Sequence, residues 1–329
     1  MNMEITIAIP VYNASKYIQK SLYSAINQDF KDFEILIIDN KSTDNTTQIV
    51  EDIIKKNPNH SIRIIKHPIN KGLGASKNTA IDNAKGKYLF FMDSDDSIEP
   101  NTLTILYNKI KQYNAQIAIG SIIYEDENQV PIQKTVCPDL HYEEKYCYLK
   151  DINSFYWMTW NKLYNLEFLK ETKIRCIPHH LHEDLWFTFQ IAAYATNIVY
   201  SSLITYHYIL NSNSICNQHK KIIQDNNLIE HIEILEHEYK VLTTTPIFNY
   251  PQLHNLYTSL FINTSYTIYS SSSKNKHNFI SRLNPLKPLL YFGHDLRYKI
   301  FLLILKLISY KAALIIDFYI ITKIRHKIR

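Results

Sequence analysis

Glycine and cysteine are both scarce in this chain, and each shortage excludes a class of site. Five of the 329 residues are glycine, and no Gly-rich loop with Arg or Lys follows the first apolar run, which argues against a nucleotidyltransferase. The cysteines lie far apart, so no pair has metal-ligand spacing and nothing indicates a disulfide framework: Cys137, Cys147, Cys176 and Cys216. We expect reduced thiols, as in a cytosolic protein.

The N-terminus lacks the pattern of a secretory signal. Glu4 interrupts it, and the apolar run Ile5–Pro10 is too short for the hydrophobic region of a signal peptide. The expected location is therefore cytoplasmic.

The net charge of +5 is carried by the C-terminal end of the chain. From residue 285 onward, nine Lys or Arg residues accompany two acidic ones, which leaves +7 there and −2 elsewhere. Ile300–Ile321 is very apolar but contains Lys306, Lys311 and Asp317. A helix of that length could span a bilayer, yet three charges and basic flanks favour a helix lying in the interface on anionic headgroups. Packing on its own domain or on a dimer partner is the alternative.

We therefore expect a peripheral protein on the inner face of the cytoplasmic membrane. The anionic partner indicated by the basic end is a membrane surface rather than a nucleic acid. The oligomeric state is left open by the sequence.

Short apolar runs alternate with amphipathic segments in the N-terminal part of the chain. The pattern predicts strands at 4–9, 33–38, 62–66 and 88–92, and helices at 15–27 (capped by Ser15), from Ser42 or Asp44 onward, and, after a loop at 70–74, at 75–83. Because strand and helix alternate, we expect a parallel sheet with right-handed crossovers. The remainder predicts a helix at 100–113, a strand at 116–124, an irregular polar segment at 125–150, a mostly helical aromatic segment at 155–169, a helix at 183–195, a strand at 198–208 and polar helices within 217–284.

The octet Leu-Phe-Phe-Met-Asp-Ser-Asp-Asp at 89–96 combines an apolar strand with three carboxylates at its end. Open α/β sheets bind ligands at the carboxyl ends of their strands. Crowded carboxylates favour a cation, and oxygen ligands suit Mg²⁺ or Mn²⁺, whose shells are commonly completed by substrate phosphates. An acidic strand-to-turn junction is an equally good reading of the octet alone.

Five further segments accompany the octet in a fixed order. The six motifs are Ile-Pro-Val-Tyr-Asn at 9–13, Ile-Asp-Asn-Lys-Ser-Thr-Asp-Asn-Thr at 38–46, Asn-Lys-Gly-Leu-Gly-Ala-Ser-Lys-Asn at 70–78, Asp-Ser-Asp-Asp at 93–96, Trp-Asn-Lys-Leu-Tyr at 160–164 and His-Glu-Asp-Leu-Trp-Phe at 182–187. Together they resemble the family 2 inverting glycosyltransferases, over residues 5 to about 214.

The resemblance implies an α/β GT-A fold, a Rossmann-like, mostly parallel sheet flanked by helices that binds nucleotide-diphospho-sugars. The expected divisions are a catalytic domain at 1–215, a helical extension at 216–284 and a basic amphipathic membrane-associating helix at 285–329. The implied activity is metal-assisted in-line transfer of a hexose or N-acetylhexosamine from a UDP-sugar. Segments 156–163 and 211–217 are also similar to bacterial lipooligosaccharide galactosyltransferases. They favour galactose as the sugar and a lipooligosaccharide, polysaccharide or lipid-linked glycan as the acceptor.

The donor side of the site is assigned by the same resemblance. Asp95 would bind Mn²⁺ or Mg²⁺, Asp93 would assist it or bind the ribose, and a histidine, His207, would complete the metal shell. The uracil would contact Asp39, Pro10 and Tyr12, and Lys77 would face the diphosphate. The alternatives are packing for Tyr12, a solvated helix charge for Lys77, a core residue for His207 and a turn or helix cap for Asp96. Gly72 and Asn78 would shape their loop.

The acceptor side is assigned to three residues. The resemblance makes Asp184 the general base, and Glu183 a carboxylate that binds or positions the acceptor. Acidic residues also favour helix N-termini, so capping is the alternative for both. Trp160 would form part of the acceptor wall, and a core tryptophan is its alternative.

Four positions depart from the family pattern. Asn40 and Lys41 stand where the family has Asp and Gly, Lys77 replaces an Arg and lacks its bidentate fork, and Ile209 occupies another Arg position. The departures at Asn40, Lys41 and Ile209 favour the second hypothesis for the chain, a catalytically silent scaffold on the same fold at the membrane surface. Intact carboxylates at Asp93, Asp95 and Asp184 favour an enzyme.

Overall fold

The computed structural model describes residues 3–144, 157–211, 225–244, 251–271 and 273–286. By its contacts, the chain forms two compact units, Met1–Ser214 and Ile215–Arg329. The basic segment expected at 285–329 lies almost entirely outside the described residues, so its membrane association stays a prediction.

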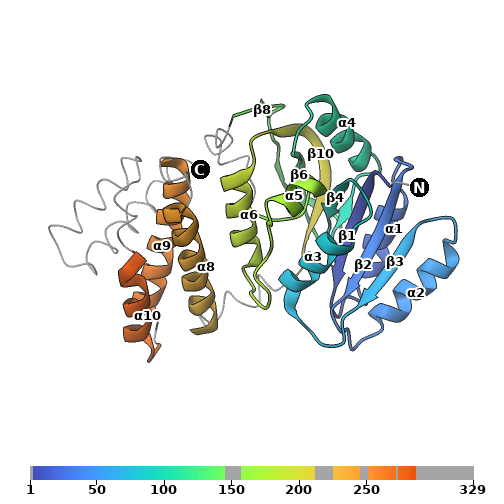
Figure 1. Cartoon of the computed structure of the whole chain (residues 1–329). Helices are drawn as coiled ribbons and strands as arrows, with labels where there is room; N and C mark the ends of the chain where they lie inside the picture. The colour runs from blue at the N-terminus through green and yellow to red at the C-terminus, as the bar shows by residue number, and fades with distance from the viewer. Residues whose placement is uncertain (1–2, 145–156, 212–224, 245–250, 272, 287–329) are drawn as a thin grey trace. The chain divides into compact units, whose positions relative to one another are not determined.

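The first unit is built on one ten-stranded sheet (Figure 1). The strands are β1 (Ile5–Val11), β2 (Phe33–Asp39), β3 (Ile62–Lys66), β4 (Tyr88–Phe91), β5 (Ser97–Ile98), β6 (Ile117–Asp126), β7 (Pro131–Thr135), β8 (His141–Tyr142), β9 (Lys162–Asn165) and β10 (Ile198–Leu210). Their order is β3-β2-β1-β4-β9-β6-β10-β5, with β7 added to β6 and β8 to β10. The pairs β3–β2, β2–β1, β1–β4 and β6–β10 are parallel.

Helices connect the strands on both sides of the sheet. They are α1 (Ile18–Ile26), α2 (Thr46–Lys56), α3 (Gly72–Asn83), α4 (Thr102–Gln112), α5 (Leu166–Glu171) and α6 (Glu183–Tyr194). Helix α1 contacts α2, whereas α3 contacts α5 and α6. This grouping follows from right-handed crossovers, because the chain moves outward from β1 to β3 and then returns to place β4 on the other side of β1.

Burial of the strands explains why the sequence pattern predicts them in this unit. Every residue of β1 is buried, and so is every residue of β2 except Phe33. Strands covered on both faces are nearly continuous apolar runs. The strands predicted at 33–38 and 62–66 accordingly match β2 and β3 to within one residue.

Three predictions about single elements are wrong. The segment expected to be mostly helical at 155–169 forms β9 and then α5, because β9 pairs antiparallel with both β4 and β6. Helix α3 begins at Gly72, so most of the expected loop is helical. The irregular segment expected at 125–150 contains β7 and β8, and its residues 145–150 lie outside the described part.

Two residues that the sequence predicts as helix caps, Ser15 and Asp44, form a hydrogen bond with each other. Ser15 does not cap α1, whose N-cap is Tyr17. The backbone N–H of Ser15 donates instead to Asp44 (3.1 Å), which also accepts the N–H of Thr46 (3.0 Å), the first residue of α2. Burial opposes ionisation of Asp44, but these hydrogen bonds outweigh it and lower the pKa to about 2.

The described part of the second unit is helical. It contains α8 (Asp225–Thr244), α9 (Pro251–Ser270) and α10 (Lys276–Leu283), which contact one another. Leu228, Ile232 and Leu235 line a buried face of α8 at helical spacing, and Arg282 of α10 pairs with Glu236 through two bonds of 2.8 and 3.0 Å. Within the described ranges, no helix has the length and apolar character needed to cross a bilayer.

Candidate active site

The predicted site residues gather where the chain reverses its direction across the sheet. Strand β1 is parallel to both β2 and β4, with Val11 opposite Asp39 and Ala8 opposite Phe91. The carboxyl ends of all three strands therefore meet at one edge. The successive crossovers diverge between β1 and β4, which is the position where open α/β sheets form a ligand-binding crevice.

The acidic loop, Asp93–Asp96, leaves β4 at this edge and is held by the end of β10. The buried carboxylate of Asp96 accepts the hydroxyl of Tyr206 and the backbone N–H of Ile209, both at 2.9 Å. Asp95 accepts the side-chain amide of Asn211 at 2.7 Å. Asp96 is thus an anchor between loop and sheet, rather than the cap of a helix.

Burial opposes the simultaneous ionisation of the carboxyl groups in this loop. It raises the pKa of Asp93 to about 6; Lys77 opposes this shift, and the negative charges of Asp95 and Glu183 add to it. Burial also raises the pKa of Asp95, and raises that of Asp96 well above its usual range. A site with these properties gains from an added cation.

Lys77 and Glu183 form a buried ion pair beside the acidic loop. Their Nζ and Oε1 atoms are 2.8 Å apart, and the two side chains are 3% and 4% exposed. Burial would lower the pKa of Lys77, but the charges of Glu183, Asp93 and other neighbours raise it. The solvated alternative for Lys77 is therefore wrong, and its ammonium faces Glu183 rather than standing free for a diphosphate.

Asp184 follows Glu183 in the first turn of α6 and is half-buried. Its pKa is raised to about 7, mainly by burial and also by the charge of Glu183, while the charge of Lys77 opposes both effects. A carboxylate with this pKa accepts protons near neutral pH, as a general base must. Its environment therefore suits the base predicted from the motif.

The glycines at 72 and 74 allow the segment before α6 to lie against α3. A Cβ at Gly74 would lie 2.5 Å from the carbonyl oxygen of Ile177, and Gly72, at φ +81°, has the backbone of His179 at 2.9 Å from the same position. Asn78 fastens this contact, because its amide bonds both the carbonyl and the N–H of Cys176 at 2.9 Å. The motif at 70–78 therefore brings Lys77 to Glu183.

The predicted uracil contacts lie at the ends of β1 and β2. Asp39 is buried and accepts the N–H of Ser42 (3.0 Å) and the hydroxyl of Thr47 (3.1 Å), while Pro10 is buried within β1. Tyr12 is 50% exposed, so it is not the packing residue of its alternative.

The departures at 40 and 41 have local structural roles. Asn40 accepts the N–H of Lys71 and donates to Asn70, both at 2.8 Å, so it ties the β2 loop to the start of α3. Lys41 has φ 68°, a left-handed conformation in which the family's glycine is free of strain.

Two predicted roles do not fit their surroundings. Both ring nitrogens of His207 are already bonded at 2.9 Å, Nδ1 to Glu125 and Nε2 to Glu99, which leaves neither for a metal ion. Trp160 is 5% exposed and stacks on Tyr206 and Tyr208, with ring centroids 4.4 and 5.3 Å apart. The core alternative describes Trp160 correctly, and we do not retain His207 as a ligand.

One buried cation near the site was not singled out from the sequence. Lys162 lies two residues after Trp160, in the motif at 160–164, and donates to the carbonyl of Met158. Burial lowers its pKa to about 7, while the charges of Cys137 and Asp184 oppose the shift. Its position within the motif was the available signal.

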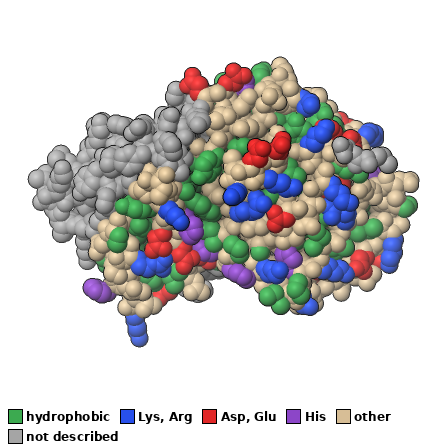
Figure 2. All heavy atoms as spheres, viewed as in Figure 1, with side chains coloured by type: hydrophobic (Ala, Val, Ile, Leu, Met, Phe, Trp, Pro, Cys, Tyr) green, Lys and Arg blue, Asp and Glu red, His purple; other side chains and the backbone are tan. Residues whose placement is uncertain are grey.

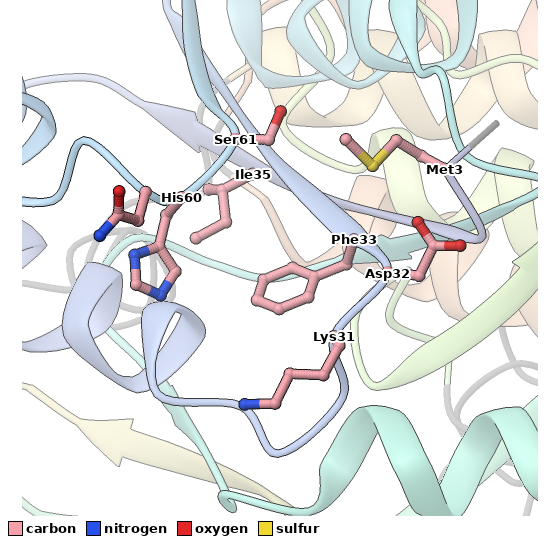
Figure 3. Close-up of a pocket in the computed structure, with 8 residues that line it drawn as sticks. Met3, Lys31, Asp32, Phe33, Ile35, His60 and Ser61 are labelled. Atoms are coloured by element: carbon pink, nitrogen blue, oxygen red, sulfur yellow. The ribbon is translucent and has the colours of Figure 1, made fainter. Parts of the chain in front are cut away.

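A shallow hollow of about 190 Å³ lies at the opposite edge of the sheet (Figure 3). Its lining includes Lys31, Phe33, Ile35, His60 and Ser61, from the beginning of β2 and the loops before β2 and β3. The predicted site residues do not contribute to it. On the face seen in Figure 2, the described residues place basic and acidic side chains next to each other, so neither sign of charge dominates there.

The family model described as "Glycosyl transferase family 2" matches residues 6–178, which is more than half of the 329-residue chain. The chain belongs to glycosyl transferase family 2. Glycosyltransferase GlyA of Streptococcus pneumoniae is 30% identical over 207 residues, or 60% of this chain and 29% of the relative. Poly(ribitol-phosphate) beta-glucosyltransferase of Bacillus spizizenii is 35% identical over 207 residues, or 61% and 31%. This family 2 chain therefore spans under a third of the length of these relatives.

Solved structures support the fold of this family 2 member. TarS 1–349 of S. aureus, in complex with UDP-GlcNAc, matches 96% of this chain and 89% of its own with a TM-score of 0.71 at 19% identity. Mannosyltransferase PcManGT from Pyrobaculum calidifontis, with GDP-Man and Mn²⁺, matches 96% and 86% with a TM-score of 0.55 at 14% identity. The GT-A fold and its helical C-terminal part, both predicted from the sequence, are confirmed.

Proposed function

We propose that this family 2 chain is an inverting glycosyltransferase that uses a UDP-sugar and a divalent cation. The observation that carries the proposal is that two features occur together in this unit. They are Asp184, with a pKa raised to about 7, and the acidic loop at the ligand-binding edge of the sheet. A proton acceptor and an anionic cluster are the two parts that an in-line sugar transfer requires of the protein.

The acidic loop fits a cation that is only partly coordinated by protein. Among the described side chains, no three from His, Cys, Asp or Glu are arranged to hold a metal by themselves. Asp93 and Asp95 would supply two carboxylates, and Mg²⁺ or Mn²⁺ characteristically completes such a shell with substrate phosphates. When bound, the cation would neutralise the diphosphate that leaves.

The other residues take roles around this pair. Asp184 removes the proton of the acceptor hydroxyl, and the Lys77–Glu183 pair holds the start of α6 beside the acidic loop. Asp39, Pro10 and the exposed ring of Tyr12 form the rim for the uracil. Glu183 acts by positioning, since its carboxylate is engaged by Lys77.

Galactose is the first sugar to test, and a lipooligosaccharide, polysaccharide or lipid-linked glycan is the expected acceptor. Segments 156–163 and 211–217 support galactose by their likeness to lipooligosaccharide galactosyltransferases. Relatives act on varied acceptors: one is named a poly(ribitol-phosphate) beta-glucosyltransferase, another a cholesterol galactosyltransferase of Borreliella burgdorferi, 33% identical over 114 residues. The basic C-terminal end supports a lipid-linked acceptor at the inner face of the cytoplasmic membrane.

The test is a donor screen. UDP release from UDP-galactose, UDP-glucose and UDP-GlcNAc would be measured with Mn²⁺, with Mg²⁺ and with EDTA. We expect release from one UDP-sugar, loss of that release in EDTA and its loss in Asp184→Asn. Undiminished release in EDTA would exclude the cation, and undiminished transfer by Asp184→Asn would exclude the base.

The second candidate is a catalytically silent scaffold. Its support was Asn40, Lys41 and Ile209, but Asn40 now has a structural role in the β2 loop. Absence of calorimetric binding for every UDP-sugar, with and without Mn²⁺, is the outcome that favours the scaffold.

A further inference from the structure

The end of β10 and the residue that follows it form hydrogen bonds with the acidic loop. The loop leaves β4, but Tyr206, Ile209 and Asn211, more than a hundred residues later, supply the partners of its three carboxyl residues. After the loop, β5 pairs antiparallel with the same part of β10, with Ile98 opposite Tyr206.

Tyr206 connects two members of the loop through one oxygen. The backbone N–H of Asp93 donates to its hydroxyl at 3.0 Å, and the hydroxyl bonds the carboxylate of Asp96 at 2.9 Å. The N–H can only donate, so it occupies an acceptor position of the hydroxyl and leaves the hydroxyl proton for Asp96.

The ring of Tyr206 is held as firmly as its hydroxyl. The side chain is fully buried and stacks on Trp160, with 4.4 Å between ring centroids and 15° between ring planes. A buried ring between a packed indole and two hydrogen bonds has one available position. This also gives Trp160 a role, which is to support the tyrosine.

We propose that Tyr206, assisted by Asn211, is a positioning residue that sets the acidic loop for the cation and the donor diphosphate. It touches neither reactant. It fixes the backbone of Asp93 from one side and, through Asp96, the other end of the loop, while Asn211 orients the carboxylate of Asp95. The proposal rests on the proposed function, because it concerns the loop that would bind the donor.

Tyr206→Phe isolates the hydroxyl. The ring and its stacking on Trp160 remain, but the N–H of Asp93 and one oxygen of Asp96 lose their partner. Tyr257→Phe is the matched control: Tyr257 is also fully buried, and its hydroxyl bonds the carbonyl of Leu286 at 2.8 Å in the second unit.

The readouts are calorimetric binding of UDP with Mn²⁺, the Mn²⁺ concentration for half-maximal UDP release, and the melting temperature. For Tyr206→Phe we expect binding of UDP with Mn²⁺ weakened roughly tenfold and a similar rise in the Mn²⁺ requirement, because buried groups lose a hydrogen bond. Tyr257→Phe should change the melting temperature by a comparable amount and leave both binding quantities unchanged.

Equal binding by Tyr206→Phe and the native protein would overturn the proposal and leave Tyr206 a packing residue. If Tyr206→Phe does not fold, Asn211→Ala decides, since unchanged binding of UDP with Mn²⁺ in that variant has the same meaning. A native protein that binds no UDP-sugar would instead exclude the proposed function itself, and the positioning role with it.

Discussion

At the scale of single residues, the site depends on how charge is distributed among buried groups. Glu183 and Asp184 are adjacent in sequence, yet Glu183 is paired with Lys77, whereas Asp184 forms no ion pair with another described residue. Burial and the neighbouring negative charge then keep the pKa of Asp184 near neutrality. Two adjacent carboxylates thereby have different electrostatic environments.

The raised pKa of Asp184 predicts an acidic limit to activity. Because a base must be ionised, kcat/KM should fall about tenfold per pH unit below about pH 7. Asp184→Asn should lose roughly 10²- to 10⁴-fold of the rate and show no such limb. Stability should depend on pH in the opposite sense. Because the folded-state pKa of Asp184 is raised, the free energy of unfolding of the native protein should decrease as pH rises towards that pKa, and Asp184→Asn should not show this decrease.

Measurement of initial rates between pH 5 and pH 9, with urea unfolding of both proteins at the same values, checks both statements. An acidic limb that persists unchanged in Asp184→Asn would assign the limb to another group.

The Lys77–Glu183 pair predicts a strongly non-additive response to mutation. Lys77→Met leaves a buried carboxylate without its cation and should destabilise the protein by about 3–5 kcal/mol. The double variant with Glu183→Gln removes both charges and should recover most of that loss. Lys77→Arg, which restores the family's residue type, serves as the control that keeps the charge. Additive effects in urea titrations would show that the two side chains do not interact in solution.

At the scale of elements, the parts predicted correctly are those whose sequence pattern records their burial. Strands β1 and β2 are nearly continuous apolar runs because they are buried on both faces. The end of β4 could be predicted because three carboxylates follow it. The short strand β9 was not, since its place between β4 and β6 depends on partners distant in the sequence.

The site was predicted in the same partial way. Motif order singled out Asp93, Asp95, Lys77 and Asp184, but it could not reveal which side chains are already engaged. The carboxylates that occupy His207 lie 82 and 108 residues away in the sequence, and the partner of Lys77 lies 106 residues away. Such pairings follow from packing and have no local signature.

The contact between α3 and the segment before α6 predicts an unusual effect of a glycine substitution. Gly→Ala within a helix ordinarily stabilises a protein by about 1 kcal/mol. Gly74→Ala should do the reverse and destabilise by about 1–3 kcal/mol, because its Cβ would lie 2.5 Å from the Ile177 carbonyl. It should also lower activity, since the contact brings Lys77 to Glu183. Thermal melting with activity assays tests this, and a stabilised Gly74→Ala would refute the close contact.

At the scale of the whole molecule, the two units invite separate tests. The sequence assigns the positive charge to the C-terminal end, where a set of four basic residues closes the chain: Lys323, Arg325, Lys327 and Arg329. Each basic residue near an anionic surface contributes about 1 kcal/mol. The segment itself lies outside the described residues, so this expectation rests on the sequence.

Replacing these four residues by Glu in the full chain should abolish sedimentation with phosphatidylglycerol vesicles and leave UDP release in solution unchanged. Binding to neutral phosphatidylcholine vesicles is the control. Equal sedimentation of both proteins with anionic vesicles would show that these four residues do not bind the membrane.

The dependence of the acidic loop on β10 has a consequence for how the protein matures. A ribosome that has released residues 1–178, the extent of the family match, has released the loop but neither Asp184 nor Tyr206. The nascent chain can pair β1 to β4 with one another early, because all four strands lie within the first 91 residues. The loop can take its final position only after residue 211 emerges, so donor binding should be among the last properties that the growing chain acquires.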